Sequence, residues 1–212
     1  IVFGHQPSAS TQQMMGASEA LAAIKESAAD NPVIMVGGHV SALPEQTLGD
    51  VPVDFVCKGE GPVTVVQLLD ALSQGEDADL GAVEGLVWRR GDEIVINPPA
   101  PLTQDLDTDL RGNAWDLLPM DKYRAHNWQC FGDLDRRTPY ASIYTSLGCP
   151  YKCHFCCINA PFDINRYRMR SPESVVGEID FLHDSYGVKT FKIIDEMFVL
   201  NERHVAAICD LL

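Results

Sequence analysis

Four of the chain's seven cysteines stand within nine positions, in the stretch TSLGCPYKCHFCC at residues 145–157. Three of them, Cys149, Cys153 and Cys156, form a C-x3-C-x2-C array, and Cys157 follows at once. A structural zinc site usually takes four ligands in two closely spaced pairs, and four-cysteine ferredoxins use a longer run. Three thiolates on one tight loop suit three irons of a cubane cluster and leave the fourth iron open. Because an open metal position can bind and activate a small molecule, the array predicts a catalytic metal centre.

A closed site remains the alternative for this array. A zinc ion or a structural cluster would need a fourth ligand, for which His154 and Cys157 are the candidates. We expect His154, beside Cys153, to point away from a cluster wrapped by the loop. We expect Cys157 to be a buried thiol, because free cysteine packs as a small hydrophobe.

The elements around the array predict a repeated strand–loop–helix unit. Residues 140–147 predict a strand that leads into the cysteine loop, and residues 171–186 predict a helix with Ser171 as its cap and proline at its first position. A second strand, ending in the acidic pair Asp195–Glu196, precedes a second helix capped by Asn201. This order is typical of the first units of a (β/α) barrel or an open sheet.

The first 75 residues also alternate strand and helix patterns, which is typical of a parallel α/β sheet. Two apolar β-branched runs end in glycine turns, GG at 37–38 and GEG at 59–61. Ligands of parallel sheets bind at the carboxyl ends of strands, so we expect both turns at the ligand edge. Residues 84–97 predict a hairpin with a Gly-Asp turn, and a proline-bearing acidic stretch follows. The predicted organisation is therefore a first domain at 1–80, a hairpin and linker at 81–139, and a second domain at 140–212.

Composition narrows the classes of partner. The net charge is −14, from 30 acidic and 16 basic residues, which argues against non-specific binding of nucleic acid. The short basic stretch NRYRMR at 165–170 is expected to be a solvated loop rather than an RNA contact. No apolar run approaches the roughly 20 residues of a membrane helix, so no membrane partner is expected. An odd number of cysteines fits reduced thiols in the cytoplasm, and both ends of the chain lie inside predicted elements, which predicts a fragment of a longer protein.

The stretch CPYKCHFC, with Phe155 before its last cysteine, resembles the radical S-adenosylmethionine superfamily. The resemblance implies that Cys149, Cys153 and Cys156 hold a four-iron, four-sulfur (4Fe-4S) cluster. Its open iron would bind S-adenosylmethionine, whose reductive cleavage gives a deoxyadenosyl radical. Phe155 would lie near the cluster and the adenine, and Glu196 would contact the amino group. The family often has Gly-Gly-Glu there, where this chain has DEMF. A small-molecule substrate and a reducing electron donor, such as flavodoxin or ferredoxin, are implied as well.

The first domain has a resemblance of its own. Its glycine-turn pattern is similar to the second half of a Rossmann-like cobalamin-binding domain of the type that precedes radical S-adenosylmethionine barrels. The resemblance implies that the nucleotide tail of cobalamin is lined by Gly37, Gly38, Gly59, Glu60 and Gly61. The alternative is an α/β module kept for packing or dimerisation, without cobalamin.

The two resemblances together imply an α/β protein: a partial Rossmann-like cobalamin-binding domain followed by the first units of a radical S-adenosylmethionine (β/α) barrel. The implied activity is methyl transfer to an unactivated carbon or to phosphorus. Ring formation or rearrangement, as in anaerobic tetrapyrrole cyclases, is the alternative within the enzyme class. A non-catalytic iron–sulfur or zinc-binding module is the alternative outside it.

Overall fold

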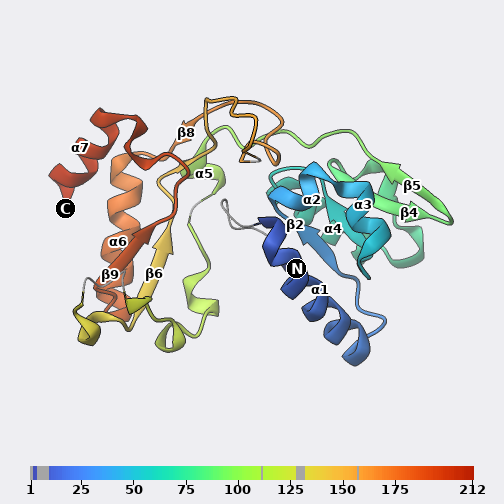
Figure 1. Cartoon of the computed structure of the whole chain (residues 1–212), viewed down its shortest axis with the longest axis horizontal. Helices are drawn as coiled ribbons and strands as arrows, with labels where there is room; N and C mark the ends of the chain where they lie inside the picture. The colour runs from blue at the N-terminus through green and yellow to red at the C-terminus, as the bar shows by residue number, and fades with distance from the viewer. Residues whose placement is uncertain (1, 4–9, 111, 128–131, 157) are drawn as a thin grey trace. The chain divides into compact units, whose positions relative to one another are not determined.

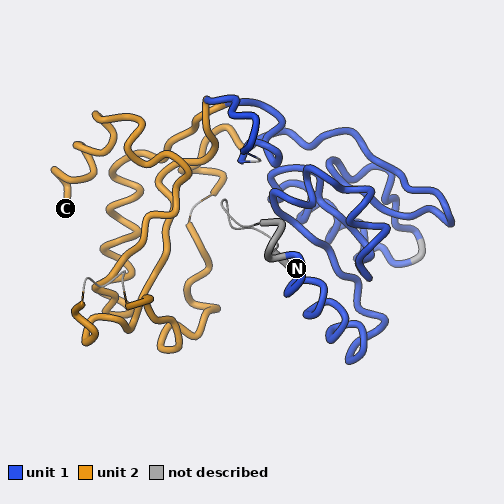
Figure 2. Tube along the Cα trace, in the orientation of Figure 1, with its two compact units in different colours: residues 1–102, 151–165 blue, residues 103–150, 166–212 orange. Residues whose placement is uncertain are grey.

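The computed structural model describes residues 2–3, 10–110, 112–127, 132–156 and 158–212 of the 212-residue chain. The fold is α/β, as predicted. The chain forms two compact units, coloured separately in Figure 2. Unit 1 comprises residues 1–102 and 151–165, and unit 2 comprises residues 103–150 and 166–212. No helix in the described ranges combines the length and the apolar character needed to cross a bilayer.

Unit 1 is built on a five-stranded sheet with the order β1-β2-β3-β4-β5. Its strands are β1 (Val2–Phe3), β2 (Ile34–Val36), β3 (Phe55–Cys57), β4 (Leu86–Arg90) and β5 (Glu93–Ile96). The first three strands run parallel, whereas β4 is antiparallel to β3 and β5 is antiparallel to β4. The predicted hairpin at 84–97 is thereby confirmed, and it extends the same sheet.

Four helices accompany this sheet (Figure 1): α1 (Ser10–Ser27), α2 (Gly38–Ala42), α3 (Pro44–Asp50) and α4 (Pro62–Ser73). Two 3-10 turns, η1 (Gly75–Asp77) and η2 (Leu80–Ala82), follow α4. Helices α1 and α4 confirm the predicted helical segments. Helices α2 and α3 were not predicted, because helices of five and seven residues are too short to show an apolar repeat.

Strands β2 and β3 and the start of β4 are apolar on both faces, and each face has its own core. One face packs against α1, α2 and α3 through Met35, Val56 and Val87 of the sheet and Leu21, Val40 and Leu48 of the helices. The other face packs against α4 through Ile34, Val36, Phe55, Cys57 and Leu86 of the sheet and Leu68 and Ala71 of the helix. Successive residues of a strand point to opposite faces, so short apolar runs supply both cores. The result is a three-layer α/β/α unit.

Unit 2 contains a parallel strand pair, β6 (Tyr140–Ile143) and β9 (Thr190–Ile193), and an antiparallel pair, β7 (Ser146–Leu147) and β8 (Arg168–Met169). Its helices are α5 (Leu106–Asp109), α6 (Pro172–Tyr186) and α7 (Glu202–Leu211). Its 3-10 turns are η3 (Trp115–Leu117), η4 (Met120–Lys122), η6 (Leu134–Arg136) and η7 (Phe198–Leu200). The order β6–α6–β9–α7 is the predicted strand–loop–helix repeat. The strand predicted at 140–147 is divided into β6 and β7, which pair with different partners.

Both long helices of unit 2 begin at the predicted caps. The Ser171 side chain accepts a hydrogen bond from the Ser174 backbone N–H at 3.2 Å, and Asn201 does the same for His204 at 3.2 Å. Helix α6 ends at Tyr186, and its C-cap, Gly187, adopts the left-handed conformation with φ 67°. Helices α6 and α7 lie next to each other beside β6 and β9 (Figure 1), and the apolar side chains of these four elements share one core.

A buried ion pair joins the start of α6 to the segments around it. The expectation of a solvated loop at residues 165–170 is therefore wrong, because Arg168 and Arg170 are buried and Arg168–Met169 form β8. Arg170 and Glu178 leave 8% and 7% of their side chains exposed, and they bond to each other through Nη1 and Oε2. Glu178 also accepts from the Trp115 indole at 2.9 Å, and Arg170 donates to the Tyr144 carbonyl at 2.9 Å. Each charge is therefore compensated within the fold, and the removal of one leaves the other buried alone.

We expect Glu178→Ala to lower the free energy of unfolding by about 3–5 kcal/mol, because Arg170 would remain buried without a counter-charge. Urea denaturation followed by circular dichroism measures this change. Asp180→Ala, at an exposed position of the same helix, is the matched control and should shift stability by no more than about 0.5 kcal/mol. Equal effects of the two substitutions would contradict a structural role for the pair.

Candidate functional site

The two glycine turns of unit 1 lie at one edge of its sheet. Gly37 follows β2 with φ 140°, and Gly59 and Gly61 follow β3 with φ 152° and 112°. Strands β2 and β3 are parallel, so their carboxyl ends share an edge. A Cβ at Gly61 would lie 3.0 Å from the Val36 side chain, so this turn packs closely against the end of β2. A Cβ at Gly59 would meet no protein atom within 4 Å, so the backbone there borders open space.

Ser41 ties the two turns together. It lies in α2, which begins directly after the first glycine turn, and it is 4% exposed. The Gly59 backbone N–H donates to the Ser41 hydroxyl at 3.2 Å. The hydroxyl in turn donates to the carbonyl oxygens of Cys57 and Gly59, each at 3.4 Å. Sequence reasoning missed this residue, because a lone serine in a segment with no predicted helix carries no signal.

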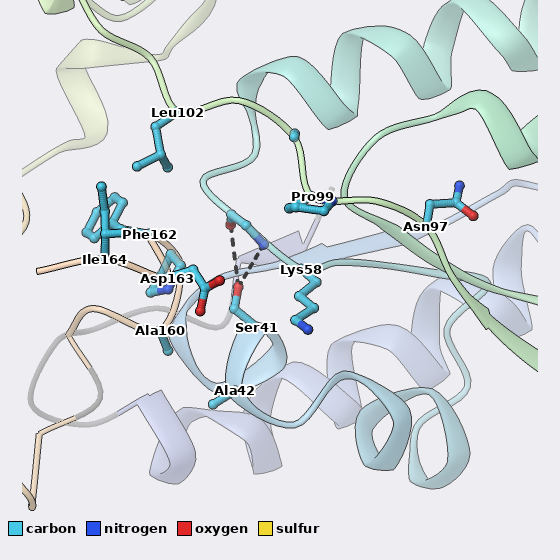
Figure 3. A pocket seen from close by; sticks show the side chains of 13 residues that line it. Ser41, Ala42, Lys58, Asn97, Pro99, Leu102, Ala160, Phe162, Asp163 and Ile164 are labelled. Atoms are coloured by element: carbon cyan, nitrogen blue, oxygen red, sulfur yellow. Dashed lines mark hydrogen bonds between the residues drawn. The ribbon is translucent and has the colours of Figure 1, made fainter.

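A cavity of about 670 Å³ opens beside Gly59, entirely within unit 1 (Figure 3). This volume is typical of small-molecule sites. The first and second glycine-turn regions supply Ser41, Ala42, Lys58 and Gly59; the segment after β5 supplies Asn97, Pro99, Ala100 and Leu102; and the segment after the cysteines supplies Ala160, Pro161, Phe162, Asp163 and Ile164. Of the five residues predicted to line the nucleotide tail of cobalamin, Gly59 lines this cavity. The cofactor role of Gly37, Gly38, Glu60 and Gly61 stays a prediction.

Two polar side chains of the cavity, Asn97 and Lys58, differ in whether they are already bonded within the protein. The Asn97 amide donates to the Leu80 and Val83 carbonyls at 2.6 and 2.8 Å and accepts from the Trp88 indole at 3.2 Å, so it braces the wall. Lys58 is exposed and makes no ion pair with any residue that the structure describes. The Lys58 ammonium is therefore available to an anionic ligand group at this edge.

The wall formed by residues 160–164 belongs to a folded segment that follows the cysteines. The amides of Asn159 and Asn165 both donate to the Tyr151 carbonyl, the first at 3.1 Å. The Asn159 carbonyl accepts from the backbone N–H groups of Phe162 and Asp163, each at 3.0 Å. These bonds close the segment on itself within unit 1. Sequence reasoning assigned it no role, because its contribution to the cavity depends on contacts with residues far away in the chain.

The three array cysteines are in the thiol form, and they lie in different environments. Cys149 is buried and belongs to unit 2, whereas Cys153 and Cys156 are exposed and belong to unit 1. No three His, Cys, Asp or Glu side chains in the described ranges are grouped to hold a metal ion. The donor set itself suits an iron–sulfur cluster, because thiolates are the ligands of such clusters. The ligand role of the three cysteines therefore stays a prediction.

Three other predictions concern the same loop. Phe155 is 93% exposed, so it makes little contact within the protein, and its place beside the adenine stays a prediction. His154 is also exposed. Cys157 lies outside the described residues.

The acidic pair that follows β9 lies beside the root of the cysteine loop. Asp195 accepts three hydrogen bonds, from the Thr145 backbone at 2.7 Å, the Thr145 hydroxyl at 2.5 Å and the Ser146 hydroxyl at 2.6 Å. Sequence reasoning placed Asp195 at the strand end but missed this role, because its partners lie about 50 positions earlier in the chain.

Glu196, the second residue of this pair, has a carboxylate oxygen whose hydrogen-bonding capacity is not used by the described residues. Its Oε2 is buried and has no hydrogen-bond partner among the described residues. Burial raises the pKa of Glu196, and the Asp195 charge adds to the rise, while a hydrogen bond from the Gly148 backbone opposes it. Burial, with both carboxylates, also raises the pKa of Tyr144 to about 12. A cationic donor bound at Oε2 would relieve the unfavourable burial of the Glu196 charge.

Comparison with known proteins gives relatives with named activities, although no protein-family model matches the chain. The chain is 37% identical over 172 residues to an uncharacterized methyltransferase of Pyrococcus horikoshii, covering 81% of this chain and 34% of the relative. It is 32% identical over 158 residues to an anaerobic magnesium-protoporphyrin IX monomethyl ester cyclase of Synechocystis, covering 74% of this chain and 29% of the relative. The chain thus spans about a third of the length of these relatives.

A solved structure shares the fold. The radical S-adenosylmethionine methyltransferase TsrM of Kitasatospora setae, with cobalamin and a [4Fe-4S] cluster bound, matches with a TM-score of 0.61 at 24% identity. The match covers 93% of this chain and 36% of that protein. The likeness supports the arrangement of a Rossmann-like domain followed by the first barrel units.

The raised pKa of Glu196 predicts a pH dependence of stability. An unfolded glutamate ionises near pH 4.3, whereas the folded protein retains the proton to higher pH. The free energy of unfolding therefore falls as pH rises from the unfolded pKa to the folded pKa, and the loss persists at higher pH. We expect Glu196→Gln to remove this fall and to be more stable than the wild type at pH 7, measured by urea denaturation between pH 4 and 8.

Glu173→Gln, at an exposed position, should leave the pH profile unchanged. A destabilised Glu196→Gln with the wild-type profile would refute the assignment.

Proposed function

Because this chain belongs to the radical S-adenosylmethionine enzymes that carry a cobalamin-binding domain, we propose that the protein transfers a methyl group to an unactivated carbon or phosphorus centre of a small molecule. The observation that carries the proposal is the C-x3-C-x2-C array in a chain 37% identical to a named methyltransferase. The chain spans about a third of that relative, so the activity is assigned to the whole protein.

The cysteine array would hold the 4Fe-4S cluster through Cys149, Cys153 and Cys156. When bound, the cluster, S-adenosylmethionine and cobalamin supply one-electron cleavage of a sulfonium and a transferable methyl group. Electrons would come from a reducing donor such as flavodoxin or ferredoxin. The acidic net charge of −14 and the absence of a long basic segment favour a small molecule over a nucleic acid as the substrate.

Glu196 would orient S-adenosylmethionine. A buried carboxylate oxygen without a partner is costly, and an ammonium group offers three N–H donors to satisfy it. The amino group of the methionine moiety is such a donor. Binding would lower the pKa of Glu196, because a cation nearby favours the ionised carboxylate.

The cavity of unit 1 would receive the nucleotide tail of cobalamin. The residues present fit this group in three respects: the open backbone at Gly59, the cavity volume and the charge of Lys58. The open space beside the Gly59 backbone would let a bulky ligand approach the strand end closely. The Lys58 ammonium matches the phosphodiester of the tail, and Ser41 keeps the turn around Gly59 in place.

Ring formation or rearrangement is the second candidate function. The specific observation in its favour is the 32% identity to the cyclase of Synechocystis. In this chain the reaction would use the same cofactors, so the residues described above do not separate it from methyl transfer.

Isotope labelling tests the proposal. The purified protein is reconstituted without oxygen, reduced, and incubated with cobalamin, S-adenosylmethionine carrying a deuterated methyl group, and an anaerobic metabolite extract. Mass spectrometry then follows 5′-deoxyadenosine and the label. Label in a new small-molecule product supports methyl transfer. Cleavage of S-adenosylmethionine with unlabelled products supports ring formation or rearrangement. Intact S-adenosylmethionine in the presence of a reduced cluster overturns both.

The cavity assignment is tested by filling the cavity. We expect Ala42→Trp to weaken hydroxocobalamin binding at least about 10-fold, because the side chain of an exposed lining residue would occupy ligand space at a cost above 1.4 kcal/mol. Absorbance titration measures the binding, and cluster absorbance should be retained. Ala22→Trp, at an exposed position of α1, is the matched control. Wild-type affinity in Ala42→Trp would place cobalamin elsewhere.

A further inference from the structure

We propose that Asp195 is a positioning residue for the cluster: its carboxylate fixes the point at which the chain leaves β6 and turns towards Cys149. The inference rests on the proposed function, because it assumes that Cys149 is a cluster ligand. Its evidence lies entirely within unit 2. Asp195 itself does not contact a cofactor in this proposal and acts through the backbone of the loop.

Both carboxylate oxygens of Asp195 accept hydrogen bonds from the segment that follows β6. Oδ1 accepts from the Thr145 N–H at 2.7 Å, and Oδ2 accepts from the hydroxyls of Thr145 and Ser146 at 2.5 and 2.6 Å. Thr145 and Ser146 are 0% and 1% exposed. Hydrogen bonds to an ionised carboxylate are shorter and stronger than neutral ones, especially where water is excluded. Asp195 therefore fixes two successive residues of the segment that follows β6.

These bonds stand where the chain changes its pairing partner. The ladder between β6 and β9 ends with Ile143, whose carbonyl accepts from the Ile194 N–H at 3.0 Å. Two residues later the Thr145 N–H bonds to Asp195 while the Thr145 carbonyl accepts from the Arg170 N–H at 2.9 Å. From Ser146 the chain pairs with β8. The Asp195 carboxylate thus bonds to the Thr145 N–H, as a neighbouring strand would, at the point where the chain stops pairing with β9 and starts pairing with β8.

The switch determines where the first array cysteine lies. Strand β7 ends at Leu147, and Gly148 (φ 82°) leads directly to Cys149, which is buried. The Gly148 backbone also bonds to Glu196, the neighbour of Asp195. The acidic pair therefore holds the segment 145–148 from both of its ends. Without Asp195, the N–H of Thr145 would be buried without a partner, and the path to Cys149 would lose the three hydrogen bonds that fix its start.

The test measures cluster retention in Asp195 variants of the protein reconstituted without oxygen. We expect Asp195→Ala to lose iron to a chelator about 10-fold faster than the wild type, in line with the effect of residues that orient metal ligands. Asp195→Asn retains an acceptor for the Thr145 N–H, and its amide donates to hydroxyls that reverse their roles, so we expect it to restore most of the retention. The matched control is Asp210→Ala, at an exposed position of α7. Far-UV circular dichroism checks folding, and electron paramagnetic resonance compares the reduced clusters.

Each outcome bears on the proposal. Fast iron loss in Asp195→Ala, recovery in Asp195→Asn and an altered resonance in the alanine variant support it. Wild-type retention and resonance in a folded Asp195→Ala overturn it, even where the wild-type enzyme still cleaves S-adenosylmethionine. If Asp195→Ala does not fold, Ser146→Ala removes one of the three bonds and should give a smaller rise in iron loss; no rise overturns the proposal. A wild-type cluster that leaves S-adenosylmethionine intact contradicts the proposed function but not the role of Asp195.

Discussion

Parallel pairing of strands is the constraint on which both units depend. It brings the carboxyl ends of β2 and β3 to one edge in unit 1, and those of β6 and β9 to one edge in unit 2. Parallel strands place their loops at the same edge, but they do not fix the loops relative to each other. In each unit a short polar side chain supplies that link. Ser41 joins the two glycine turns, and Asp195 joins the end of β9 to the segment that leads into the cysteine loop.

The links made by Ser41 and Asp195 differ in charge and in the lengths of their hydrogen bonds. Ser41 is neutral, and its bonds of 3.2–3.4 Å hold a turn whose backbone borders open space at Gly59. Asp195 is charged, and its bonds of 2.5–2.7 Å fix a buried strand end. Under the proposed function, the stronger link lies on the path to a cluster ligand, and the weaker link lies at a turn that would contact the nucleotide tail of cobalamin. Glu196 then stands next to a fixed point, with its Oε2 buried and without a partner among the described residues.

The features that the sequence predicted correctly are those set by local chemistry. Ser171 and Asn201 cap their helices because their side-chain oxygens reach backbone N–H groups three residues ahead. The hairpin of β4 and β5 follows from its turn residues, and the strand–helix order follows from the apolar pattern. The features that it missed depend on distant partners. The division of the strand at 140–147 is set by Asp195 about 50 positions later, and the cavity wall at 160–164 is set by contacts with the segments around Ser41, Lys58 and Asn97. Helices α2 and α3 are too short to leave a periodic pattern.

In the proposed function, three cysteines hold a cluster with one iron left for S-adenosylmethionine. Electron paramagnetic resonance of the reduced, reconstituted protein with and without S-adenosylmethionine tests this assignment. We expect a 4Fe-4S signal whose g values shift when S-adenosylmethionine binds, and which is lost when Cys149, Cys153 or Cys156 is replaced by alanine. A signal that does not respond to S-adenosylmethionine, or a protein that takes up one zinc ion in place of iron and sulfide, would contradict it.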